Sequence, residues 1–355
     1  MNRAVAEMSE ASSTSLDARA GKLLTRSRKN LSTTRLRETV IYIGLIACGL
    51  FSLLITVSIV GVLLGETLQF FRFDEVTLAN FLGSAEWTPL LGATKSFGIW
   101  GLISGTLLVT GIAMAFALPL GLITAIYLSE YAPRKTRDIL KPILEVLAGI
   151  PTVVYGFFAL MTITPFLQWV HDGFNVYNAM SAGLAVGILC FPTVCSLAED
   201  ALQSVPNSLR DGALGLGGTR FDATLKVILP AALSGIISAF LLAVARAIGE
   251  TMIVALAAGS RPQATLDPRD EIQTMTGFMV QMAGGDVSNF GTEYFSMYAV
   301  AFTLFLITII SLRYIHGIAS NCDRLIFITL KFQSLLLFLL TLFLFLCLFN
   351  TIILC

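Results

Sequence analysis

Seven long apolar segments constrain this chain more than any other feature of its sequence. Each is near or above the roughly 20 residues that an α-helix needs to cross the hydrocarbon core of a bilayer. Because a lipid-exposed segment must satisfy its own backbone hydrogen bonds, we expect an all-α, polytopic membrane protein. The segments cover residues 39–64, 99–128, 142–170, 181–198, 230–258, 296–315 and 325–355.

The composition agrees with a location in the bilayer. The chain is 55% hydrophobic and 13% charged, whereas a soluble domain carries about 25% charged residues. Its six cysteines lie in or beside apolar segments without metal-ligand spacing, so we interpret them as small core residues and expect no metal site. No nucleophile, base or metal-ligand set is clustered along the sequence, which disfavours an enzyme.

Basic residues lie asymmetrically between the apolar segments. The polar tail, residues 1–38, carries basic residues close to the first segment. We expect this tail to be disordered and cytoplasmic, since positive charge favours the cytoplasmic side of a membrane. The basic loop 134–141 is also expected inside. Alternation then places residues 199–229 in the cytoplasm and residues 259–295 outside.

The cytoplasmic segment 210–230 is built like a small folded element rather than a simple connector. Leu214, Phe221 and Leu225 can anchor it in a groove on a partner protein, and Pro230 opens the next apolar segment. Its small residues remove bulk where two helices turn and touch. An amphipathic helix resting on the membrane surface is the alternative. The small residues are Gly212, Ala213, Gly215, Gly217 and Gly218.

Asp211 can cap or charge-stabilise a helix start, or pair with a basic residue of a partner. It also begins a spaced pattern: Asp211-Gly212-Ala213, three residues, Gly217, nine residues, Val227, one residue, Leu229-Pro230. This pattern resembles the cytoplasmic signature of ABC-importer permeases, E-A-A, three residues, G, nine residues, I, one residue, L-P. Asp211, Gly212 and Val227 depart from it, each by a close chemical substitute. The resemblance implies a coupling helix that docks into a groove on an ATPase.

Three further stretches narrow the resemblance. They are YLSEYAP at 127–133, EVLAGIPTVVYG at 145–156 and ARAIGETM at 245–252. Together with the loop they resemble the PstC-type permease of phosphate importers over residues 40–313. The Gly-Glu-Thr-Met sequence that ends the stretch 245–252 favours this type over its sister permease.

The resemblance implies an architecture, an activity and partners. Residues 39–315 would form the six-helix core of a type I ABC-importer permease, which moves inorganic phosphate across the bacterial inner membrane into the cytoplasm. Its partners would be a PstA-type sister permease, an ABC ATPase dimer and an extracytoplasmic phosphate-binding protein. No Gly-Lys-Ser/Thr phosphate loop follows the glycines of the cytoplasmic loop, so a partner must bind ATP and magnesium, and this chain needs no cofactor.

Arg246 and Glu250 lie within the apolar segment 230–258, where a central charge costs roughly 2.5–3.5 kcal/mol. Their i, i+4 spacing predicts one shared helix face. We favour a substrate-pathway role, in which the planar donors of Arg246 bind phosphate oxygens and Glu250 orients Arg246 or weakens its grip. The alternative is an ion pair that fixes this helix to a neighbour. Glu145, in contrast, is interpreted as a simple partner of Lys141.

The sequence leaves two alternative functions open and contains one atypical segment at its C-terminus. The transported oxyanion could be tungstate, molybdate or sulfate, and the chain could instead be a membrane scaffold or sensor that transports nothing. Residues 316–355 depart from the resemblance in a Leu/Phe-rich, atypical extension. This extension is either a seventh helix or the product of a frameshifted reading frame, and its composition favours the frameshift.

Overall fold

The computed structural model describes residues 38–39, 41–73, 76–84, 86–89, 96–285 and 291–319. The predicted disordered tail lies outside these residues except for its last position, and the predicted C-terminal extension lies outside them beyond residue 319. Contacts divide the chain into two units, Met1–Val62 and Leu63–Cys355. Helix Ile41–Phe70 begins in the first unit and ends in the second.

The described residues contain five helices that are long and apolar enough to cross a membrane, and a bent helix pair that makes a sixth candidate. The predicted all-α, polytopic fold is therefore confirmed over this part of the chain. The five helices are Ile41–Phe70, Trp100–Tyr131, Thr152–Val170, Ala179–Gln203 and Thr292–Arg313, and the bent pair is Arg220–Ala231 with Leu233–Ile248.

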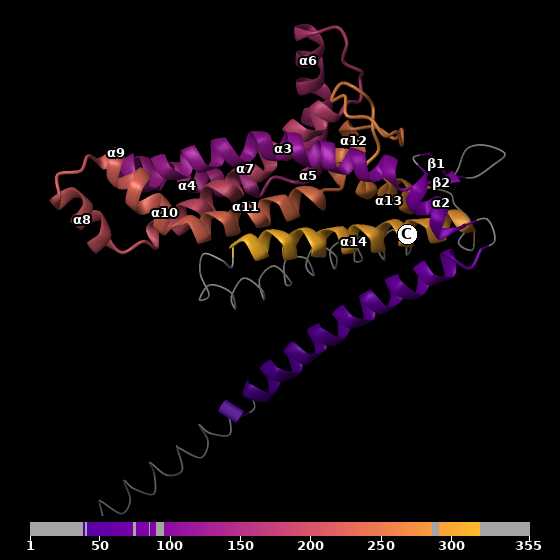
Figure 1. The fold of residues 1–355 in the computed structure, drawn as a ribbon, viewed down its shortest axis with the longest axis horizontal. Helices are drawn as coiled ribbons and strands as arrows, with labels where there is room; N and C mark the ends of the chain where they lie inside the picture. Colours follow the sequence, from indigo (N-terminus) through magenta and orange to yellow (C-terminus); the bar gives the residue numbers. More distant parts are fainter. Residues whose placement is uncertain are drawn as a thin grey trace, which may run out of the picture. The chain divides into compact units, whose positions relative to one another are not determined.

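Three long helices form the centre of the second unit: α3 (Trp100–Ile126), α7 (Ala179–Gln203) and α11 (Leu233–Ile248). They run side by side in Figure 1. A Cβ atom on Gly183 of α7 would lie 2.7 Å from Cβ of Ile112 on α3, so glycine is required for this close approach. Small side chains at helix contacts provide the dispersion energy that holds helices together in lipid.

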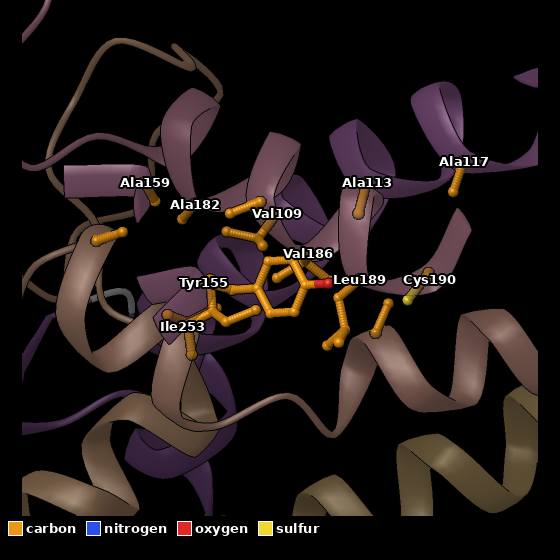
Figure 2. Packing of buried hydrophobic residues seen from close by; sticks show 14 of the residues in the cluster. Val109, Ala113, Ala117, Tyr155, Ala159, Ala182, Val186, Leu189, Cys190 and Ile253 are labelled. Atoms are coloured by element: carbon orange, nitrogen blue, oxygen red, sulfur yellow. The ribbon is translucent and has the colours of Figure 1, made fainter. Parts of the chain in front are cut away.

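The largest core cluster lies between these helices and the neighbouring helix α5 (Thr152–Phe158). Figure 2 shows the Tyr155 ring of α5 lying among Val186, Leu189 and Ile253. The Tyr155 hydroxyl donates a 2.7 Å hydrogen bond to the carbonyl of Leu147, so this buried polar group is satisfied.

A small aromatic region lies at the end of the second unit opposite to α8 (Asn207–Gly215) in Figure 1. It contains α2 (Leu78–Gly83), a two-stranded antiparallel sheet of β1 (Trp87–Thr88) and β2 (Ser96–Phe97), and α13 (Met275–Gly284). Trp87 is fully buried and packs edge-on against Phe97 and Phe278. Helix α14 (Thr292–Ala319) packs against both α13 and α11.

The third predicted span is shorter than its apolar sequence suggested. Residues 142–148 belong to α4 (Arg134–Ala148), a separate amphipathic helix, and the membrane-length helix begins only at Thr152. It continues through η2 (Ala159–Ile163) and α6 (Thr164–Val170). Pro151 causes the interruption, because it has no N–H and disfavours a helical residue before it.

The fifth predicted span, residues 230–258, is broken at both ends. Its entry is a π-helix, η3 (Thr224–Ile228), followed by α10 (Leu229–Ala231), and the axis bends by 68° before α11. At the other end α11 stops at Ile248, and a short helix α12 (Met252–Ala257) follows.

Candidate functional site

The predicted cytoplasmic loop forms a helical hairpin at one end of α7 and α11 (Figure 1). Its first arm is α8, and its second arm is α9 (Arg220–Ala223), which leads into η3. None of the residues of α8 is buried. The first arm is therefore presented at the molecular surface, whereas the second arm buries Ala223.

Gly217 ends the first arm with a left-handed backbone conformation, φ +85°. Its N–H donates to the carbonyl of Leu214 (3.0 Å), and the N–H of Gly218 donates to the carbonyl of Ala213 (3.2 Å). This pair of bonds is the Schellman motif, which satisfies the last carbonyls of a helix and favours glycine at its left-handed position. The signature glycine is thus a helix terminator.

Three of the small residues of the loop do not serve close packing within this chain. A Cβ atom would meet nothing within 4 Å at Gly212, Gly215 or Gly217. The prediction that these glycines remove bulk where two helices touch is therefore wrong for these three positions in this chain. At Gly218 the added atom would lie 2.9 Å from the Ala213 carbonyl, so close approach is required there.

Asp211 is the fifth residue of α8 and not its cap, because α8 begins at Asn207 after Pro206. The prediction of a helix start at Asp211 is wrong, and its side chain is exposed instead. The second arm does carry a cap, since Thr219 Oγ1 accepts a hydrogen bond from the N–H of Asp222. Leu229 is half-buried and Pro230 is exposed, one turn before the bend.

The three predicted apolar anchors are all exposed on the hairpin. Phe221 is 63% exposed, Leu225 51% and Leu214 44%. Leu216, which the sequence did not single out, is 92% exposed and immediately precedes Gly217. Such an exposed apolar patch typically marks an interaction surface, either for another protein or for a membrane.

Arg246 and Glu250 do not share a helix face, since α11 ends at Ile248 between them. The carboxylate of Glu250 is buried and accepts a hydrogen bond from the N–H of Ile253 (3.4 Å), at the start of α12. Thr276 Oγ1 donates to the carbonyl of Glu250 (2.7 Å). Glu250 therefore holds the break between the two helices in place.

Arg246, half-buried near the end of α11, lies within electrostatic range of Tyr155, Cys190 and Glu250. No ion pair involves Arg246 or Glu250 among the residues that the structure describes. The alternative of an ion pair to a neighbouring helix therefore finds no support in this part of the chain.

A further charged cluster, which the sequence did not reveal, fixes α4 to the end of α7. Glu199 is 1% exposed and pairs with Arg137 (2.8 Å) and Lys141 (3.4 Å). Lys141 also pairs with Asp200 (3.1 Å), so the predicted Lys141–Glu145 pairing is wrong. Partial burial lowers the pKa of Lys141, but Asp200 and Glu199 outweigh burial and leave the pKa raised above its ordinary value.

These features define a class of protein: a polytopic helical membrane protein with an exposed hairpin suited to docking another protein. Residues 117–319 match the family described as binding-protein-dependent transport system inner membrane component. The chain belongs to this family, and it is a multi-pass component of the inner membrane.

Two relatives show how far the likeness extends. A probable ABC transporter permease, YqgH of Bacillus subtilis, is 32% identical over 296 residues, which cover 82% of this chain and 94% of that relative. The phosphate transport system permease PstC of Mesorhizobium japonicum is 31% identical over 252 residues, which cover 66% of this chain and 76% of the relative. The resemblance to PstC-type permeases predicted from the sequence is confirmed, and such relatives are transport subunits rather than enzymes.

The fold is similar to solved transporter structures. A chain of a bacterial alginate ABC transporter, solved with an alginate pentasaccharide-bound periplasmic protein, superposes with a TM-score of 0.58. The match covers 80% of this chain and 95% of that chain at 14% identity, so it concerns the fold alone. The six-helix permease core expected from the sequence agrees with this likeness.

Proposed function

We propose that this chain is the permease subunit of an ATP-driven importer that moves inorganic phosphate into the bacterial cytoplasm. Relatives named phosphate transport system permease PstC support the substrate. The observation that carries the coupling to ATP is the exposed hairpin α8–α9, with Leu216 and Phe221 at its surface. Apolar side chains on a polar loop lose contact with water when they enter a groove on a partner.

The partner of the hairpin is an ABC ATPase dimer, which binds ATP and magnesium in place of this chain. A PstA-type permease completes the pore beside it, and an extracytoplasmic phosphate-binding protein delivers the anion. The N-terminus lies in the cytoplasm, on the same side as the hairpin. The basic residues of the tail and of α4 support this orientation.

Arg246 and Glu250 line the pathway of the anion. Arg246 contributes a fixed positive charge with planar donors that suit phosphate oxygens. Glu250 accepts a hydrogen bond at the start of α12, and its carboxylate offsets the charge of Arg246 so that the anion can leave again. A binding site in a transport pathway must bind its ion weakly enough to release it. The negative charge of Glu250 weakens the attraction of Arg246 for the anion.

Phosphate uptake by the assembled importer tests the proposal. The change Arg246→Gln removes the charge and should lower uptake by roughly 10- to 100-fold, since a hydrogen bond to a charged group contributes about 1.5–3 kcal/mol. ATPase co-purification should remain normal, because Arg246 lies far from the hairpin along α11. The control Lys135→Gln removes an exposed charge outside the membrane helices and should leave uptake unchanged.

Competition identifies the anion. Radiolabelled phosphate uptake is measured in the presence of excess sulfate, molybdate or tungstate, with unlabelled phosphate as the reference. Stronger competition by another oxyanion than by phosphate would assign the importer to that oxyanion. Normal phosphate uptake by Arg246→Gln would remove the pathway role of Arg246, and no uptake of any oxyanion by the native complex would favour a scaffold or sensor.

A further inference from the structure

One side chain of the hairpin reaches two other helices. Arg210 Nη2 lies 3.0 Å from Glu130 Oε1 in η1 (Tyr127–Tyr131), which continues α3. The same nitrogen donates to the carbonyl of Leu202 at the end of α7 (2.7 Å). Arg210 Nη1 donates to Asn207 Oδ1 in the first turn of α8 (3.1 Å). A single guanidinium therefore connects α8 with α3 and α7.

The pair is protected from solvent more than most surface ion pairs. The side chain of Arg210 is 22% exposed and that of Glu130 is 13% exposed. Ser129 Oγ donates to the same carboxylate oxygen of Glu130 (3.1 Å), which fixes its orientation. Low exposure reduces both screening by salt and freedom of the side chains, so this contact holds one geometry.

The rest of α8 offers little packing that could transmit a force. None of its residues is buried, and its backbone neighbours are mainly α9 and η3 of the same hairpin. Packed side chains resist relative sliding, whereas an exposed helix slides over its neighbour at little cost. The connection of α8 to the centre of the molecule therefore depends on polar contacts.

Beyond Glu130, α3 provides a continuous path across the molecule. Its residues Val109, Ala113 and Ala117 are buried in the largest core cluster. Near its other end, Thr106 Oγ1 accepts a hydrogen bond from the N–H of Met275 in α13 (3.0 Å). A displacement applied at Glu130 thus reaches the far end of the membrane core through one helix.

We propose that the Arg210–Glu130 ion pair is the joint that transmits movement of the hairpin to α3. The pair positions α8 and is not part of the surface that contacts the ATPase. This proposal rests on the proposed function, in which an ATPase moves the hairpin. Movement of the hairpin then reaches α11 through the chain itself, by way of Gly217, α9 and the bend before α11. The Arg210–Glu130 joint carries the same movement to α3.

The test uses the full importer, with its ATPase and sister permease, in proteoliposomes that enclose ATP and magnesium, and the phosphate-binding protein is supplied outside. The variants are Arg210→Gln, Glu130→Gln and the exchange Glu130→Arg with Arg210→Glu. ATPase co-purification, ATP hydrolysis and phosphate uptake are measured for each. As a control, Asp267→Asn breaks the exposed Asp267–Arg269 pair in the loop between α12 and α13. This variant should show native ATPase co-purification, ATP hydrolysis and phosphate uptake.

For both single variants we expect normal ATPase co-purification and ATP hydrolysis, with phosphate uptake per ATP reduced about tenfold, a typical size for coupling between distant sites. The charge exchange should recover at least a third of the native ratio, since it restores the ion pair without the hydrogen bond from Arg210 to Leu202. Native uptake per ATP in either single variant would overturn the proposal. Loss of ATPase co-purification in both single variants without recovery in the exchange would also overturn it, because the pair would then only support folding.

A spin label separates failure of this proposal from failure of the proposed function. Leu107 of α3 is 55% exposed, so Leu107→Cys accepts a label without disturbing the core, and the exposed Cys48 is replaced by Ser to lower the background. If the native complex hydrolyses ATP but takes up no phosphate, the proposed function fails. The joint is then supported if ATP changes the mobility of this label in the native complex and not in Arg210→Gln, and it is overturned by any other result.

Discussion

At the scale of single residues, Gly217 shows that a signature glycine can serve backbone conformation rather than space. Its φ of +85° belongs to the left-handed region, and the hydrogen bonds of Gly217 and Gly218 end α8 there. A side chain at this position would meet no atom of the chain. The strain of a substituted residue would therefore come from its own backbone.

Gly217→Ala should destabilise the end of α8 by about 1–2 kcal/mol, the cost of a left-handed conformation for a residue with a Cβ atom. Faster hydrogen exchange of the α8 amides would show this, and less ATPase should co-purify. Gly212→Ala is the matched control, because Gly212 is helical with open space around it. That change should stabilise α8 by about 0.5–1 kcal/mol. Equal exchange rates in the two variants would reject the conformational explanation.

At the scale of elements, α4 is an example of an apolar sequence that does not cross the membrane. Its apolar residues Ile139, Ile143 and Val146 are exposed along one face, whereas Arg137 and Lys141 reach Glu199 of α7. A helix with an apolar face and a basic face typically lies along a membrane surface. The buried carboxylate of Glu199 holds α4 against α7.

Glu199→Gln should destabilise the protein by about 1–2 kcal/mol, a value discounted for the partial exposure of both basic partners. Removal of the charge leaves Arg137 and Lys141 without their buried partner. Thermal unfolding of the purified protein in detergent measures the effect. Asp200→Asn is the neighbouring control, since its side chain is 59% exposed, and it should cost less than about 0.5 kcal/mol. Similar losses in both variants would contradict a special role of Glu199.

At the scale of the whole molecule, the second unit has two different ends. The hairpin α8–α9 lies at one end of the long helices, and α2, the small sheet and α13 lie at the other (Figure 1). The loop between α12 and α13 lies against the start of α7, where the N–H of Met180 donates to the carbonyl of Pro268 (2.8 Å), and it carries Leu266, which is 82% exposed. The proposed orientation places the first end in the cytoplasm.

Cysteine labelling in intact cells checks this orientation. A membrane-impermeant thiol reagent should label Leu266→Cys in intact cells, and should label Leu216→Cys only after the cells are permeabilised. Both positions are highly exposed, 82% and 92%, so accessibility differs by side and not by burial. Cys48 is exposed and is replaced by Ser in both variants to lower the background. Labelling of Leu216→Cys in intact cells would reverse the topology.

The sequence predicted the fold class, the family and the surface of the hairpin, because each depends on local properties. Apolar length, the placement of basic residues and the spacing from Asp211 to Pro230 are all properties of short stretches. The exposure of Phe221 follows from its position in a polar loop. The same reasoning failed where an apolar stretch continued past a break, as at Pro151 and Gly249.

Thus the sequence alone determined that this is a polytopic helical permease with an exposed loop between two of its helices, since hydrophobic length and motif spacing act over a few turns of chain. Only the tertiary structure decided which charges meet. Glu130 and Arg210, or Lys141 and Glu199, lie on different helices far apart in the sequence. Their pairing depends on how the helices pack, a long-range property that no local pattern of residues contains.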